Sequence, residues 1–198
     1  MILTNDIIKK NYENYSNKNM KISREAKKGN LIKIINGLYE TNPNVNGYLL
    51  ANSIYGPSYL SFDFALSYYG LIPEKVTTYT SATCEKKKKK KYSNQFGNYS
   101  YRDVPTFVYP LGIRIIEEGE YFFQIATPEK ALCDKLYTIS PVKNFTELEN
   151  LLFDDLRIDE EEFKKLNIDD IKEISNSYHC NNVDMLYRYI RRAENWIM

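Results

Sequence analysis

The sequence predicts an α+β fold in three parts: a small N-terminal winged helix, an α/β core with a short antiparallel strand meander, and a helical C-terminal tail. Apolar residues recur with helical spacing toward both ends of the chain. Through its middle they alternate with polar residues, as strands require. The 198 residues suffice for one domain or two small ones. We place the boundaries at residues 1–45, 46–140 and 141–198.

The N-terminal part is predicted to hold two helices and a hairpin. Thr4 is a suitable N-cap for the first helix, and a second helix follows around Met20 to Lys28, where Gly29 ends it. The runs LIKII and LYET then flank Asn36-Gly37, a pair that tolerates the two positive φ angles of a type I′ turn. Two helices followed by a two-stranded wing form the outline of a winged helix.

The core begins with two helical segments, GYLLANSIYG and SFDFALSYYG. The second has clear end signals, with Ser61 as a plausible N-cap, Gly70 at C′ and Leu71 as its hydrophobic contact. After Pro73 the apolar period changes to two. Strands are expected at 76–81, 96–102 and 106–109, and at GIRII and YFFQI around the turn EEGE, followed by a helix that Thr127 caps and Pro128 opens.

The tail is predicted to be helical from Asn144 onward. Leucines recur there at helical spacing, from Leu148 to Leu156. The acidic cluster at 159–162 could be metal ligands or paired carboxylates, and a pair at 169–170 repeats its pattern before an apolar periodic stretch. They also fit the first turns of solvated helices, where anions face the positive end of the helix dipole, and we favour this interpretation.

The net charge of +1 is a cancellation between a basic front and an acidic back. Lys and Arg total 27 and Asp and Glu total 26. Residues 1–45 and 46–110 each carry 8 basic and 4 acidic side chains, whereas residues 111–198 carry 11 basic and 18 acidic ones. This asymmetry indicates a surface that faces a polyanion and a separate surface that is solvated or faces a protein.

Several classes of protein are disfavoured by composition. No apolar run approaches the roughly 18–20 residues that cross a bilayer, and charge appears too early in MILTNDIIKK for a signal peptide. The three cysteines are widely spaced, which disfavours a disulfide scaffold or a zinc ribbon. We therefore expect a cytoplasmic protein that has no membrane partner.

Motifs for catalysis are missing from the sequence. It contains no P-loop, no dinucleotide-binding glycine motif and no nucleophile elbow, and His179 is its one histidine. His179 beside Cys180 could contribute to a metal site, but an ordinary polar residue in a helical tail is the simpler interpretation. Cys133 is expected to be a packed thiol on a half-buried helix. We expect no enzyme, no cofactor and no metal.

Nucleic-acid binding has more support. Basic and amide side chains gather on the second helix and the wing, and such groups donate to phosphates and base edges. The alternative is that they form only a solvated face. The candidate residues are Lys18, Lys21, Ser23, Arg24, Lys27, Lys28, Asn30, Lys33 and Asn36.

A run of six lysines interrupts the predicted meander. We expect it on an exposed connection between strands, where it could neutralise phosphates without selecting a sequence. The alternative is a mobile, solubilising loop that protects a sheet edge. These residues are Lys86, Lys87, Lys88, Lys89, Lys90 and Lys91.

At PSYLSFDFALSYYGLIPE, residues 57–74, the sequence resembles the AbiEi family, the antitoxins of type IV toxin–antitoxin systems. Upstream, GNLIKIINGLYET looks like the wing of that family. Downstream, VTTYTSAT, EKKKKKKY, FGNYSYRDVP and IATPEKALCDKLY follow in the family's order. The likeness extends over residues 21–137.

The resemblance implies a winged-helix transcriptional regulator that binds operator DNA with repeats and represses its own operon. It implies an AbiEi-like antitoxin core at 46–140, a nucleotidyltransferase-like toxin encoded next door, and a role in abortive infection and phage defence. It also implies a monomer in solution or a dimer on DNA. The alternative is a protein-interaction module that neutralises or scaffolds a partner without binding DNA.

Overall fold

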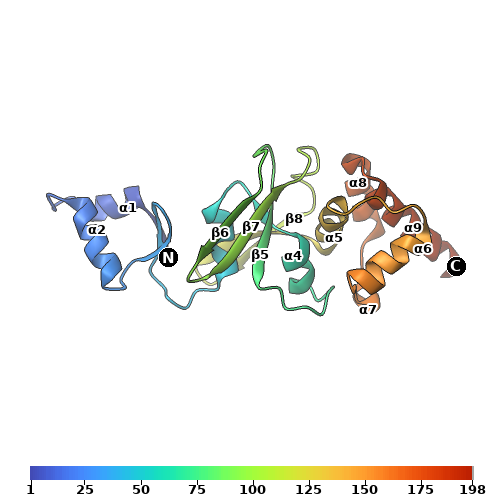
Figure 1. The fold of residues 1–198 in the computed structure, drawn as a ribbon, viewed down its shortest axis with the longest axis horizontal. Coiled ribbons are helices and arrows are strands. Elements are labelled where there is room, and N and C mark those ends of the chain that lie inside the picture. The colour runs from blue at the N-terminus through green and yellow to red at the C-terminus, as the bar shows by residue number, and fades with distance from the viewer. Residues whose placement is uncertain (198) are drawn as a thin grey trace.

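The computed structural model describes the secondary structure of residues 1–197 and the side-chain environments of residues 1–192. The molecule is elongated: a small N-terminal unit lies at one end, a mixed sheet in the middle and the C-terminal helices at the other end (Figure 1). The predicted α+β class is confirmed, since the chain forms helices and two sheets.

The N-terminal unit, residues 1–40, contains β1 (Ile2–Thr4), α1 (Asn5–Asn11), α2 (Lys18–Lys27), β2 (Ile32–Ile35) and β3 (Leu38–Glu40). Its three strands are antiparallel in the order β1-β3-β2. The predicted Thr4 cap is confirmed, because its side chain accepts the Ile7 N–H. Strand β1 was not expected. A small core of Ile8, Ile22 and Leu31 lies beneath the helices.

The hairpin forms at Asn36-Gly37, but the predicted type I′ turn is wrong. Only Gly37 has a positive φ, of +83°, and one positive φ at the second loop position is the pattern of a type II turn. The register shifts between Lys33 and Ile35, which places a bulge in β2. A bulge increases the local twist that a primed turn would otherwise supply.

The central sheet has six strands in the order β6-β7-β5-β4-β9-β8. The predicted antiparallel meander is wrong, since β5 runs parallel to β7 and β4 runs parallel to β9. The chain leaves β5 for the far edge, forms β6, and returns as β7 beside β5. The strands are β4 (Tyr59–Leu60), β5 (Thr78–Thr83), β6 (Lys90–Asn94), β7 (Gly97–Asp103), β8 (Ile113–Glu118) and β9 (Tyr121–Ala126).

The strand predicted at 106–109 is also wrong. This segment forms consecutive turns, in which the Tyr109 N–H donates to the carbonyls of Pro105 and Thr106. Pro105 fixes its own φ near the value that turns require, which favours a turn over an extended strand.

Helical segments cover both faces of the sheet. On one face lie η1 (Gly47–Leu50) and α3 (Ala51–Ile54), and the hydroxyls of Tyr99 and Tyr101 donate to carbonyls of these segments. On the other face lie α4 (Phe62–Tyr68) and α5 (Pro128–Tyr137), and Thr80 of β5 donates to the carbonyl of Ser61 at the start of α4.

The ends of α4 and α5 follow their sequence signals, with one exception. Leu71 N–H donates to the Leu66 carbonyl after Gly70, whose φ is +77°, so the predicted helix end is confirmed as a Schellman motif. Thr127 caps α5 through the Lys130 N–H. Ser61 occupies the N-cap position of α4, but its hydroxyl donates to Asp134 at 2.5 Å instead of capping.

The predicted helical tail is confirmed. Its acidic clusters begin helices: Asp159 caps α7 and Asn167 caps α8, with Asp169 and Asp170 in the first turn. Among the described residues, no helix combines the length and apolar character that crossing a membrane requires. The elements are α6 (Phe145–Glu149), the π-helical segment η2 (Asn150–Asp155), α7 (Glu160–Phe163), α8 (Ile168–Tyr178) and α9 (Asn181–Ile197).

A buried polar cluster joins the tail to the sheet. Asp134 is fully buried and accepts hydrogen bonds from the hydroxyls of Tyr59, Ser61 and Tyr178. Lys130 Nζ lies 2.9 Å from Asp134 Oδ1, in ion-pair contact but without the alignment of a hydrogen bond. The tail and the sheet also share one continuous hydrophobic core.

Candidate nucleic-acid interface

Helix α2 has one buried face and one exposed basic face. Asn17 caps the helix by accepting the Met20 N–H at 3.0 Å. Ile22 and Glu25 are buried, whereas Arg24 and Lys27 are exposed in its last turn, where the helix dipole favours cations. The helix therefore presents positive side chains to solvent.

Glu25 organises the buried side of this helix. Its carboxylate accepts from Lys21 Nζ and from Asn30 Nδ2, both at 2.7 Å, and lies 3.7 Å from Lys28 Nζ. The hydrogen bonds from Lys21 and Asn30 lower the pKa of Glu25 to about 2. The hydrogen bond with Glu25 likewise raises the pKa of Lys21, whose Nζ also lies over the ring of Tyr15. Lys21 and Asn30 are thus engaged by the buried Glu25 carboxylate.

Most of the remaining candidates of the unit are exposed to solvent. Ser23, Arg24 and Lys27 are exposed on α2, and Lys33 on β2. Asn36 is exposed at the hairpin turn, and Lys18 is half-buried at the start of α2. Among the described residues, neither Arg24 nor Lys27 has an acidic partner at ion-pair distance. Their charges are available to a ligand.

The lysine run does not lie wholly on a connection, so that prediction is wrong in part. Lys90 and Lys91 belong to β6, which forms a hairpin with β7. Lys86 folds back, donating to the Gly56 carbonyl at 3.0 Å with its Nζ over the ring of Tyr55. Lys87 has a φ of +57° and donates its N–H to Asp103. The run is anchored at both ends.

Next to this run the structure forms two hollows that sequence reasoning missed. The inner hollow, of about 230 Å³, is lined by Lys89, Lys91, Arg102 and Lys135 among others. The outer hollow, of about 460 Å³, shares Lys89 and Arg102 with it and adds Tyr137. The lysine run was a signal for this site, but Arg102 and Lys135 carry no local motif.

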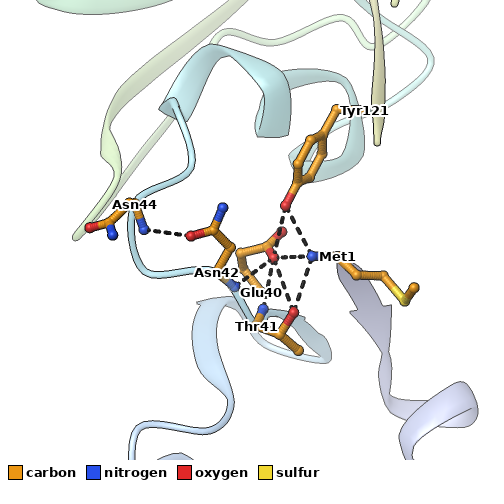
Figure 2. A network of polar contacts seen from close by, with 6 residues as sticks. All are labelled: Met1, Glu40, Thr41, Asn42, Asn44 and Tyr121. Carbon is orange, nitrogen blue, oxygen red and sulfur yellow. Dashed lines mark hydrogen bonds and ion pairs between the residues drawn. The ribbon is translucent and has the colours of Figure 1, made fainter. Parts of the chain in front are cut away.

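A polar network connects the N-terminal unit to the core (Figure 2). The fully buried Glu40 accepts from the Met1 ammonium group and from the hydroxyl of Tyr121, with N–H donors of Thr41 and Asn42 completing the network. Burial alone would raise the pKa of Glu40, but these donors outweigh it and the pKa is lowered. Burial and the bond to Glu40 raise the pKa of Tyr121 to about 12.

Apolar and polar contacts also position the unit, since Ile32, Ile34 and Leu38 belong to the same hydrophobic core cluster as the sheet. Asn94 Nδ2 of β6 donates to the Ile34 carbonyl of β2 at 3.2 Å. A hollow of about 690 Å³, lined by Asn44, Glu118 and Tyr121 among others, separates the unit from the β8–β9 turn. The junction therefore combines a buried polar network with apolar packing.

In the described part of the chain, no three His, Cys, Asp or Glu side chains are grouped so that they could hold a metal ion. His179 is exposed at the end of α8, with a φ of +48°. Cys133 is fully buried rather than half-buried, and burial raises the pKa of its thiol far above the ordinary value.

No protein-family model matches the sequence, and no curated protein matches it. The likeness to the AbiEi family therefore depends on the motifs around residues 57–74 and their order along the chain.

Proposed function

We propose that this chain is a non-catalytic antitoxin of the AbiEi type that also binds operator DNA and represses its own operon. The observation that carries the proposal is the exposed basic face of α2, whose Arg24 and Lys27 have no acidic partner among the described residues. A helix on a small terminal unit that exposes cations without acidic partners is suited to contact with a polyanion.

The arrangement of the unit supports a winged helix. Strand β1 precedes two helices and closes the sheet against β3, and the β2–β3 hairpin follows α2 as a wing would. In this proposal α2 enters the major groove, as recognition helices do, while the hairpin contacts the backbone. The domain boundaries at residues 45 and 140 belong to the same proposal.

The exposed side chains differ in what they can recognise. Arg24 can donate two parallel hydrogen bonds to a guanine edge or a phosphate. Ser23 and Asn36 can donate to phosphates or bases, whereas Lys27 and Lys33 act as point charges on the backbone. Lys86–Lys91 stay a proposed second contact, in which Lys87, Lys88 and Lys89 are exposed before β6.

The remainder of the proposal comes from the family resemblance. The partner is a nucleotidyltransferase-like toxin encoded next door, and the site of action is the cytoplasm. Two monomers meet on the repeats of the operator. The system serves abortive infection and phage defence.

The test is the salt dependence of binding to labelled DNA from the chain's own promoter, followed by fluorescence anisotropy. Arg24→Ala/Lys27→Ala removes two charges without touching the Glu25 cluster, and Lys75→Ala/Lys172→Ala removes two exposed charges elsewhere. If α2 reads DNA, the first variant weakens binding and reduces the slope of log K against log salt by about 1.8, since each phosphate contact contributes about 0.9. Equal affinities and slopes in both variants would show that α2 is not the reader.

The protein-interaction alternative is favoured by one observation. Ile115 and Phe122 on β8 and β9 are 69% and 65% exposed, beside a hollow of about 350 Å³. Contiguous exposed apolar side chains mark interaction surfaces. Co-purification of the neighbouring gene product that resists nuclease and is lost in Ile115→Asp/Phe122→Asp would support this alternative.

A further inference from the structure

The inner and outer hollows lie next to each other, and together they are called the basic recess. They share Lys89, Arg102 and Thr138, and they lie between the β6–β7 hairpin and the helices α4 and α5. Together their volumes fall in the range of about 300–1,000 Å³ that is typical of small-molecule sites. The recess thus has room for a ligand larger than a single ion.

The recess carries a large excess of positive charge. Seven basic and two acidic side chains line it. Asp63 is paired with Lys135 at 2.5 Å, and Asp103 accepts from the Thr83 hydroxyl and the Lys87 N–H, both at 2.6 Å. Among the described residues, no acid lies at ion-pair distance from Arg102 or from the lysines of the run. Concave walls concentrate such a field and attract anions.

The cations are positioned by regular structure. Lys91 stands opposite Ser100 in the β6–β7 ladder, and Arg102 lies two residues further on the same face of β7. The guanidinium of Arg102 lies over the ring of Phe62, 5.8 Å from its centroid. Phe62 has a φ of +55°, which is rare for a bulky residue. Backbone strain of this kind occurs preferentially at ligand sites.

An exposed aromatic ring completes the recess. Tyr137, at the end of α5, is 39% exposed and lines the outer hollow next to Lys89 and Arg102. Rings placed beside basic grooves stack on unpaired bases, and duplex DNA keeps its base faces covered. Clustered cations with an adjacent ring therefore match a free nucleotide better than a duplex backbone.

We propose that this recess binds a nucleoside triphosphate, with the phosphates near Lys89, Lys91, Arg102 and Lys135 and the base on Tyr137. This site lies outside the N-terminal unit and does not depend on the proposed DNA binding by α2. It assigns Lys89 and Lys91 to a nucleotide instead of the second DNA contact.

Isothermal titration calorimetry with ATP and with inorganic triphosphate tests the proposal on the full chain. Lys89→Ser/Arg102→Gln is expected to weaken both ligands about tenfold or more, because charge-assisted hydrogen bonds are lost. Tyr137→Leu is expected to weaken ATP about fivefold or more and to leave inorganic triphosphate unchanged, because only the base contacts the ring. Lys75→Ser/Lys172→Ser controls for net charge.

Three outcomes would overturn the proposal. ATP binding could be equal in the recess variant and the charge control, or Tyr137→Leu could leave ATP binding unchanged. A single-stranded oligonucleotide could also bind the recess while ATP and triphosphate do not.

Arg24→Ala/Lys27→Ala should bind ATP normally, so failure of this proposal and failure of the DNA proposal are distinguishable. Melting temperatures near that of the parent show that the variants fold.

Discussion

Glu25 determines whether the basic face of α2 is presented in an ordered form. Its carboxylate ties Lys21 within the helix to Asn30 beyond it, so the chain leaves α2 in a fixed direction. The cluster pairs Lys21 and Lys28 with Glu25 and leaves Arg24 and Lys27 without an acidic partner among the described residues.

This cluster predicts a pH dependence. The pKa of Glu25 is about 2 in the folded chain against an ordinary value of 4.5, so the carboxylate stabilises the fold above pH 4.5. That stabilisation is lost as the pH falls from about 4.5 toward 2, because the unfolded chain then binds the proton more readily. The carboxyl carbon of Glu25, followed by NMR, should titrate near 2, and Lys21→Met should move its midpoint upward. A midpoint near 4.5 in the parent chain would refute the role given to Lys21 and Asn30.

At the scale of elements, the packing of η1 against the β6–β7 turn positions the recess-forming hairpin. Gly47 begins η1, and a Cβ there would lie inside van der Waals contact of the Phe96 carbonyl and the Tyr79 ring. Tyr99 of β7 also donates to the Gly47 carbonyl at 3.1 Å. The close approach of two backbones therefore requires glycine.

Gly47→Ala is expected to destabilise the fold by about 1–3 kcal/mol, the usual cost of overpacking, since backbone atoms must move. Ser53→Ala, at an exposed position of the neighbouring α3, should change stability by less than about 0.5 kcal/mol. Urea unfolding followed by circular dichroism compares the two variants. Similar unfolding midpoints for both variants would mean that the contact between η1 and the β6–β7 turn accommodates a Cβ at position 47 without loss of stability.

At the scale of the whole molecule, the N-terminal unit has a small core of its own and joins the remainder through the Glu40 network and through apolar side chains of its hairpin. Ile8, Ile22 and Leu31 form this small core, whereas Ile32, Ile34 and Leu38 of the unit pack into the extensive core that the sheet and the tail share. Stability is lowest where little apolar surface is buried. The unit should therefore open more readily than the rest of the chain.

Hydrogen exchange measured by mass spectrometry tests this expectation. Peptides within residues 1–40 should exchange faster than peptides from β5 and α5. Tyr121→Phe removes one hydrogen bond to Glu40, worth about 1 kcal/mol, and should speed exchange in the unit several-fold while leaving α5 unchanged. Uniform exchange along the chain would show that the junction couples the two parts fully.

The candidate DNA-binding residues could be found from the sequence because they cluster within about 20 positions. The recess could not be found, because Arg102 and Lys135 come from separate elements and meet the lysine run only in the folded chain. Strand β6 was missed because lysine has low β propensity, although sheet edges favour it. The Glu40 network has no motif and joins residues more than 80 positions apart.

The sequence by itself determined the helix ends and the helical character of the tail, because caps, Schellman glycines and apolar periodicity act over a few residues. Only the tertiary structure decided the order and direction of the strands. Strand β5 could pair with β6, the next strand along the chain, or with β7. The choice depends on long-range burial against η1, α3, α4 and α5, which no local signal encodes. The same long-range packing decided that Ser61 serves the buried Asp134 rather than its own helix.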